Sequence, residues 1–292
     1  MDDLAQVIDG ERVEERYYNG AGASDDANLK SASKSILSIL VGIALDQGYL
    51  RNVHDTIGQF FPQYLEETDD PAKLKITIED LLTMRSGLES TSSRNYGRWV
   101  QSSNWVRHAL FRPMADQPGG RMIYSTGNSH LLSALLTEST AMSTLEFARR
   151  YLAGPLGIRI RPWMRDPQGI YFGGNEMHLT PRAMLEIGEL YLNRGRAGDQ
   201  QVVSAAWIEE SFKPRTQSRW SGNEYGYGWW IRTLAGYRIY YAWGYGGQFI
   251  FVVPDLEVVV VVTSSASPGR GRRGHRQAIY DLMEQDLLPA VR

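Results

Sequence analysis

Strand-like and helix-like patterns are segregated along this chain, and that segregation constrains its fold more than any other feature. The N-terminal stretch LAQVIDGERVEERYY is typical of two short strands joined by a turn at Asp9-Gly10. Four more β-branched and aromatic runs follow residue 224: YGYGWWIR, YRIYYAWG, GQFIFVVP and LEVVVVVTSS. These strands can form one antiparallel sheet only if the two ends of the chain meet.

The middle of the chain shows mostly helical patterns separated by loops that contain Pro and Gly. We therefore expect residues 1–50 and 200–292 to form an α/β lobe, and residues 51–199 to form an inserted all-helical lobe. Besides the helix that begins near residue 31, the pattern predicts helices over 77–87, 129–140, 143–157, 180–195, 204–212 and 275–288.

Composition excludes several classes of function. With 33 acidic and 31 basic residues, the net charge of -2 favours neither nucleic acid nor an anionic membrane surface. The chain has no cysteine, and its five histidines lack zinc-ligand spacing, so we expect no metal. No run approaches the roughly 20 apolar residues of a membrane span.

The N-terminal sequence MDDLAQVIDG has no charged-then-apolar signal pattern. We expect a cytoplasmic protein if Met1 is the native start, and a periplasmic or secreted one if a leader was removed.

The stretch KSASKSILSILVGIALDQGYL carries the first candidate site. Its residues 36–45 are apolar in nearly every direction around a helix, which is typical of a buried helix. Ser31 and Lys34 lie three residues apart in its first turn and so share a face. A lysine carried into a low-dielectric interior loses its charge more readily, and a neutral lysine can accept a proton from a serine hydroxyl. Ser31 is therefore a candidate nucleophile and Lys34 its candidate base.

A structural interpretation of the same stretch stays open. Ser31 could be a helix N-cap while Lys34 extends to water, and a single S-x-x-K is expected about once by chance in a chain of this length. It is the one S-x-x-K in the sequence, however, and only five residues are lysines.

Two other stretches favour the catalytic interpretation. PGGRMIYSTGNSHLL places Tyr124 after a Pro-Gly-Gly turn and just before a helix. YYAWGYGGQFIFVVP places Gly244, Gly246 and Gly247 within a strand pattern, where glycine often marks the close approach of a backbone or a ligand. A core tyrosine and a β-bulge are the alternatives for these two features.

The order of S-x-x-K, Y-S-x and a Gly-rich strand resembles the serine β-lactamase-like family. That family includes class C β-lactamases, DD-peptidases, family VIII carboxylesterases and 6-aminohexanoate-dimer hydrolase. The resemblance covers nearly the whole chain through phrases such as LLTMRSGL, DPQGIYFGG, LTPRAMLEIGELYLNRG and GYGGQFIFVVPDLEVVVVVTS. It implies an α/β (α+β) fold of the class C β-lactamase type, in which an antiparallel sheet flanked by helices joins an all-helical lobe. A single site would then lie between the lobes.

The resemblance also implies roles. Ser31 would be the nucleophile, Lys34 its base and Tyr124 the second proton carrier, while the backbone N–H groups of Ser31 and Tyr245 would form the oxyanion hole. No cofactor is implied.

The sequence departs from the β-lactamase pattern at two places. Thr126 stands where the family's Y-x-N motif has Asn, and Ala242-Trp243-Gly244 replaces the K-T-G triad, so its cation is missing. We expect Thr126, Trp243 and Gly244 to contact substrate. Arg219, Arg232 or Arg238 could supply a charge from flanking segments.

These departures favour a carboxylesterase acting through an acyl-enzyme on small neutral esters. Two alternatives stay open: an amide hydrolase of the dimer-hydrolase or β-lactamase type, and a catalytically silent penicillin-binding-like sensor or scaffold. The expected partner is a small-molecule ester or amide, and no oligomeric state is predicted. A Ser-His-Asp esterase is not expected, because the chain has no G-x-S-x-G elbow.

Overall fold

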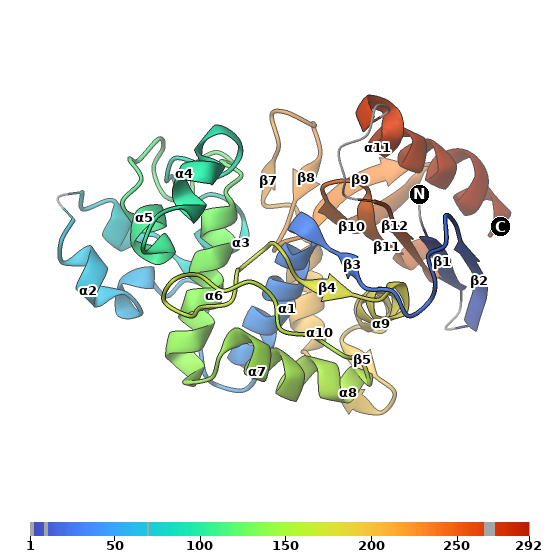
Figure 1. Ribbon diagram of the computed structural model, residues 1–292, viewed down its shortest axis with the longest axis horizontal. Coiled ribbons are helices and arrows are strands. Elements are labelled where there is room, and N and C mark those ends of the chain that lie inside the picture. Colours follow the sequence, from blue (N-terminus) through green and yellow to red (C-terminus); the bar gives the residue numbers. More distant parts are fainter. Residues whose placement is uncertain (1–2, 9–10, 69, 266–271, 292) are drawn as a thin grey trace.

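One antiparallel sheet joins the two ends of the chain. The computed structural model describes residues 3–8, 11–68, 70–265 and 272–291. Its main sheet has eight strands in the order β2-β1-β12-β11-β10-β9-β8-β7. The strands are β1 Asp3–Ile8, β2 Glu11–Tyr17, β7 Thr216–Gln217, β8 Glu224–Tyr225, β9 Trp230–Leu234, β10 Tyr237–Gly244, β11 Gln248–Val253 and β12 Val258–Thr263. The first strand, β1, pairs with the last, β12, so the two ends of the chain meet in one sheet, as the sequence predicts (Figure 1). The predicted turn at Asp9-Gly10 lies outside the described residues.

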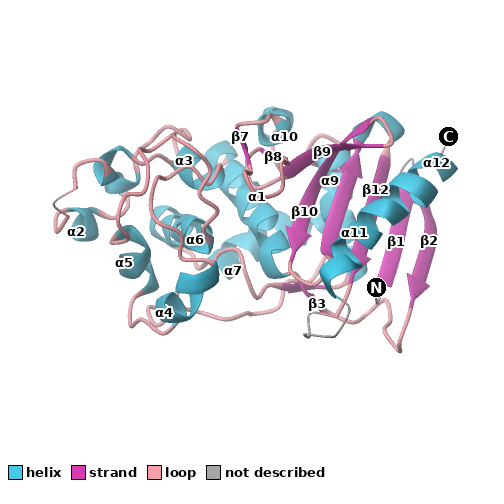
Figure 2. Cartoon of the chain, turned by 90° about the horizontal axis from the view of Figure 1, so that it is seen from above, coloured by secondary structure: helices cyan, strands magenta, loops and turns pink. Residues whose placement is uncertain are grey.

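The central strands are apolar throughout because both faces of the sheet are covered. Every residue of β11 and β12 is buried. On one face, α9 (Pro181–Leu192) packs against β1, β11 and β12. On the other face, the rings of Phe249 and Phe251 join the same apolar core as Tyr280 and Met283 of the C-terminal helices. Those helices are α11 Arg272–Leu282, the π-helical turn Met283–Leu287 and α12 Leu288–Ala290. Figure 2 shows α11 and α12 lying across the sheet.

The remaining helices gather beside the sheet (Figure 1). They are α1 Ser33–Asp46, α2 Pro62–Leu65, α3 Ile78–Leu82, α4 Tyr96–Val100, α5 Trp105–Leu110, α6 Thr126–Thr140, α7 Thr144–Ala148, the π-helical turn Arg149–Ala153, α8 Gly154–Leu156 and α10 Ala205–Phe212. Short 3₁₀ turns cover Lys30–Ala32, Ile57–Gln59, Lys73–Lys75, Ser93–Asn95 and Pro254–Leu256. Two small antiparallel ladders lie outside the main sheet. One pairs β3 (Ala27–Asn28) with β4 (His178–Leu179), and the other pairs β5 (Arg196–Ala197) with β6 (Gln200–Gln201). The division into lobes at residues 51 and 199 stays a prediction, and α9, which lies within the predicted helical part, packs on the sheet.

Local backbone geometry explains where the elements differ from expectation. The helix predicted over 77–87 starts as expected, with a capping box between Thr77 and Asp80, but it ends at Leu82. Met84 adopts a left-handed φ of 60°, which a helix cannot continue. The run YGYGWWIR divides into β8 and β9 at Gly228, whose φ is 77°.

The predicted apolar helix is α1, and it is buried on all sides. Twelve of its residues, from Ser33 to Ala44, are buried. It contacts α6 among the helices and β10 in the sheet. Ser31 itself lies one step earlier, in the 3₁₀ turn Lys30–Ala32. The fold therefore holds Ser31 and Lys34 where the helices meet the sheet.

Candidate active site

Lys34 and Ser31 are in direct contact. The Lys34 Nζ lies 3.1 Å from Ser31 Oγ, donates to the Gly174 carbonyl at 2.8 Å and lies 3.4 Å from Thr126 Oγ1. The lysine residue is only 3% exposed. Because burial disfavours the ammonium form, the pKa of Lys34 falls from 10.5 to about 7. At neutral pH a substantial fraction of Lys34 is therefore an uncharged amine that can accept the Ser31 proton.

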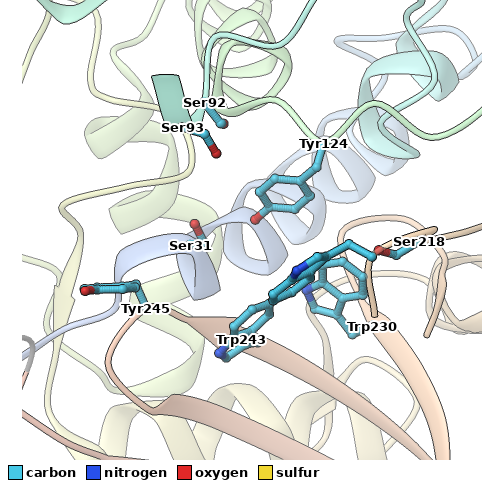
Figure 3. A pocket seen from close by; sticks show the side chains of 9 residues that line it. Ser31, Ser92, Ser93, Tyr124, Ser218, Trp230, Trp243 and Tyr245 are labelled. Atoms are coloured by element: carbon cyan, nitrogen blue, oxygen red, sulfur yellow. The ribbon is translucent and has the colours of Figure 1, made fainter. Parts of the chain in front are cut away.

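Tyr124 is the third residue of this group, beside Ser31 and Lys34. It precedes α6 by two residues, and its ring centroid lies 5.2 Å from Lys34 Nζ. Burial raises the pKa of Tyr124 to about 12, against the opposing effect of a hydrogen bond with the Ser31 side chain. Its hydroxyl points toward Ser31 (Figure 3). Tyr124 is thus protonated at neutral pH and can act as a proton donor.

A distant loop supplies the main hydrogen-bond acceptor of Lys34. Strand β4 pairs with β3, and the Leu29 N–H donates to the Met177 carbonyl at 2.9 Å, which brings the loop before β4 beside Lys34. Gly174 has a φ of 78°, and a Cβ at this position would lie 2.7 Å from the Lys34 Cγ. Only glycine can therefore bring this carbonyl so close to the amine.

A buried His–Asp pair anchors the same loop. The Gly173 N–H donates to His130 Nδ1 at 3.3 Å, so His130 Nε2 carries the hydrogen that it donates to Asp166 Oδ2 at 2.9 Å. Both side chains are fully buried. His130 therefore has a structural role here, as its lack of metal-ligand spacing suggests.

The glycine-rich stretch after Trp243 approaches the backbone before Ser31. A Cβ on Gly244, the last residue of β10, would lie 2.0 Å from the Leu29 carbonyl oxygen. The close approach predicted from the glycines is therefore present at Gly244. Tyr245 follows in the turn to β11 and lines the same cavity as Ser31. The oxyanion hole formed by the Ser31 and Tyr245 N–H groups stays a prediction.

The reactive groups open into a cavity of about 380 Å³ with mostly aromatic walls. Its lining residues are Ser31, Ser92, Ser93, Tyr124, Ser218, Trp220, Trp230, Trp243 and Tyr245 (Figure 3). None of these nine side chains is charged at neutral pH. The cavity is therefore suited to an uncharged substrate with apolar parts.

The other predicted substrate contacts differ in position. Trp243 lines the cavity. Thr126 is buried at 5% exposure and contacts Lys34 and the Ser92 hydroxyl, the latter at 3.0 Å. Gly244 is fixed against Leu29 instead of lining the cavity. Substrate binding by Thr126 and Gly244 stays a prediction.

A cation lies next to Trp243, and it comes from a segment that local sequence reasoning did not consider. The guanidinium carbon of Arg276, on α11, lies 4.6 Å from the Trp220 ring centroid and 4.9 Å from that of Trp243. Two arginines considered from the sequence are engaged elsewhere: Arg232 stacks on Tyr280 and Arg238 pairs with Glu224.

Sequence reasoning missed Gly174, Trp220, Trp230 and Arg276. The phrase DPQGIYFGG marked the neighbourhood of Gly174, but no local signal marks a carbonyl as the acceptor of a lysine 140 residues away.

Among the described residues, no group of three or more His, Cys, Asp or Glu is placed to hold a metal ion. No helix in the described part of the chain is long and apolar enough to cross a membrane.

Comparison with known proteins shows the family of this chain. The model of the Beta-lactamase family matches residues 4–283. The chain belongs to this family. This is a family of hydrolases of the β-lactamase fold.

Individual relatives differ in activity. The chain is 23% identical to 6-aminohexanoate-dimer hydrolase from Paenarthrobacter ureafaciens over 90% of this chain and 72% of the relative. It superposes on a hydrolase with promiscuous acyltransferase activity with a TM-score of 0.76 and 17% identity, covering 95% and 93% of the two chains. It also superposes on an octameric penicillin-binding protein homologue from Pyrococcus abyssi with a TM-score of 0.75 and 19% identity, covering 98% and 73%. The structural likeness supports the predicted fold class.

Proposed function

We propose that this protein is a carboxylesterase that hydrolyses small neutral esters through an acyl-enzyme on Ser31. The observation that carries the proposal is the 3.1 Å contact between Lys34 Nζ and Ser31 Oγ at a buried lysine whose pKa falls to about 7. A base with a pKa near the working pH and in contact with the nucleophile is what general-base activation requires.

The first half of the reaction forms the acyl-enzyme. Ser31 Oγ bonds to the ester carbonyl carbon as its proton moves to Lys34 Nζ. The carbonyl oxygen becomes an oxyanion, which the N–H groups of Ser31 and Tyr245 stabilise, each such donor typically contributing about 3 kcal/mol. The bond to the alcohol oxygen then breaks, and that oxygen takes a proton from the Tyr124 hydroxyl. The Lys34 ammonium returns a proton to Tyr124, so both groups regain their starting states.

The second half consumes one water molecule. Water attacks the acyl carbon as Lys34 accepts its proton, and the bond to Ser31 Oγ breaks as that oxygen regains a proton. The net reaction converts one ester and one water into a carboxylic acid and an alcohol.

The cavity supports an ester over an anionic β-lactam or peptide. An ionised carboxylate in the cavity would lose its water without a charged partner among the nine lining residues, and an unpaired buried charge costs several kcal/mol. Ala242 stands in the triad position where the resemblance would place a cation, and the next residue, Trp243, offers apolar area instead.

An amide hydrolase is the second candidate, and Arg276 favours it. This guanidinium lies 4.9 Å from the Trp243 ring centroid, close enough to the cavity wall to attract a substrate anion. The similarity to 6-aminohexanoate-dimer hydrolase supports the same candidate. A catalytically silent sensor or scaffold is the third candidate, and its acyl-enzyme would form slowly or not at all and would not turn over.

Mass spectrometry of the intact protein after exposure to activated esters, amides and β-lactams tests the proposal. We expect p-nitrophenyl acetate to leave a transient acetyl group on the peptide containing Ser31 and to be turned over. The Ser31→Ala variant should fold and remain unmodified, while the control Ser139→Ala, at the far end of α6, should behave as the parent. A stable adduct without turnover would support the scaffold, and activity equal to the parent in Ser31→Ala would overturn the whole proposal.

A further inference from the structure

Trp220 is the most exposed large apolar side chain of the described residues, and it lies at the cavity. Its exposure is 71%, and it belongs to the segment between β7 and β8. Leaving an indole in water forfeits the stabilisation that its burial would give. The ring is nevertheless held in place: it is nearly parallel to Trp243, at 9° and a centroid distance of 5.9 Å, and Arg276 lies over it. An exposed indole that contacts Trp243 and Arg276 at a reactive cavity indicates a surface that a ligand covers.

Trp220 is one end of a continuous series of rings that begins at Tyr124. Tyr124 stacks on Trp230 with a centroid distance of 5.8 Å and an angle of 23°. Trp230 meets Trp243 edge-on at a centroid distance of 5.9 Å, and Trp243 in turn stacks with Trp220. We call Tyr124, Trp230, Trp243 and Trp220 the aromatic wall.

The position of Tyr124 decides which part of an ester meets the aromatic wall. This step rests on the proposed function, in which Tyr124 protonates the departing alcohol oxygen. A group that donates this proton must lie within hydrogen-bond reach of that oxygen, so the alcohol part lies beside Tyr124. From there Trp230 and Trp243 of the aromatic wall lie on one side, whereas Ser92 and Ser93 lie on the opposite side (Figure 3).

We infer that the aromatic wall is a leaving-group site that selects esters of aromatic alcohols. A flat ring can stack on the exposed Trp220 or meet a neighbouring ring edge-on, and such contacts add to the effect of buried area alone. A saturated ring of the same size buries similar area but lacks these contacts. The expected preference for an aromatic over a saturated alcohol part is roughly three- to tenfold in kcat/KM.

Four matched esters test the inference. Benzyl acetate and cyclohexylmethyl acetate differ only in the ring of the alcohol part, and their alcohols have similar acidity. Methyl phenylacetate and methyl cyclohexylacetate carry the same two rings on the acyl part. We expect the aromatic preference for the first pair and a difference of less than about twofold for the second, because the acyl part faces the serines.

Two variants connect the preference to Trp220. Trp220→Leu keeps an apolar side chain but removes the ring, and it should lower the preference in the first pair, because only the other rings of the aromatic wall remain. Trp220→Phe keeps a ring and should retain most of the preference. Because Trp220 is 71% exposed, neither substitution leaves a buried cavity that would prevent folding. Equal rates for the first pair in the parent would overturn the inference, and so would an aromatic preference confined to the acyl pair.

A binding measurement separates this inference from the proposed function. In Ser31→Ala, saturation-transfer NMR and tryptophan fluorescence can compare the binding of benzyl alcohol and cyclohexylmethanol without any turnover. Tighter binding of benzyl alcohol, with no ester hydrolysed by the parent, would support the aromatic site and overturn the carboxylesterase. Hydrolysis of all four esters with equal binding of the two alcohols would overturn the aromatic site and leave the carboxylesterase standing.

Discussion

Replacing Lys34 with methionine should change how stability depends on pH. In the folded protein the pKa of Lys34 is about 7, because burial disfavours its charge, against 10.5 for an exposed lysine. Between these two pH values the unfolded chain binds a proton that the folded protein lacks. The free energy of unfolding therefore gains about 1.4 kcal/mol per pH unit from this one group. Below pH 7 both states are protonated, and the full cost of the buried charge is present.

The variant Lys34→Met lacks this contribution. Between pH 7 and pH 9 the parent should therefore gain about 2–3 kcal/mol of stability relative to Lys34→Met. The variant also lacks the hydrogen bond from Lys34 to the Gly174 carbonyl. This leaves a buried acceptor unpaired and lowers the free energy of unfolding by about 1–3 kcal/mol at every pH. The diagnostic quantity is thus the slope with pH, not the offset.

Urea unfolding followed by tryptophan fluorescence at pH 6, 7, 8 and 9 measures that slope. Lys75→Met is the matched control, because Lys75 is exposed and its substitution should leave the pH dependence of the parent unchanged. Parallel curves for Lys34→Met and the parent would refute the lowered pKa.

The same group should govern activity: kcat/KM of the parent should rise through an apparent pKa of about 7 and level off at higher pH.

Three further predictions concern the site. Tyr124→Phe should lower kcat by roughly 10²- to 10⁴-fold and leave KM nearly unchanged in steady-state kinetics, and a rise in KM alone would make Tyr124 a binding residue. Gly174→Ala should lower kcat about 10²-fold, because its methyl group would displace Lys34, whereas Gly169→Ala, with a similar positive φ but no neighbour within 4 Å, should retain activity. Short neutral esters should be hydrolysed at least roughly a hundredfold more efficiently than benzylpenicillin, and similar kcat/KM values would show that a cation offsets the charge of the penicillin carboxylate, with Arg276 beside Trp243 as the candidate.

Periodicity in the sequence was enough to predict the main elements. The apolar runs of β11 and β12, the all-round apolar helix α1 and the Thr180 cap of α9 are local patterns, and the structure has each of them. The meeting of the two chain ends in one sheet also follows from pattern, because an isolated pair of strands is only marginally stable and needs further strands, but the pattern does not say that β1 pairs with β12. The ends of helices were less predictable. Helix α3 ends at Leu82, before the predicted end, because Met84 adopts a left-handed conformation, and nothing in the neighbouring sequence indicates this.

The candidate nucleophile and its base were visible in the sequence because they lie one helical turn apart, where spacing alone determines contact. The rest of the site depends on contacts between distant segments. The Gly174 carbonyl meets Lys34 across 140 residues, and Arg276 reaches Trp243 from α11, a helix that joins the same apolar core as Trp243. The lowered pKa of Lys34 is likewise a property of the assembled interior, because desolvation depends on everything packed around the amine. The sequence by itself determined which groups can react, and only the tertiary structure decided their ionisation and the aromatic surroundings of the substrate.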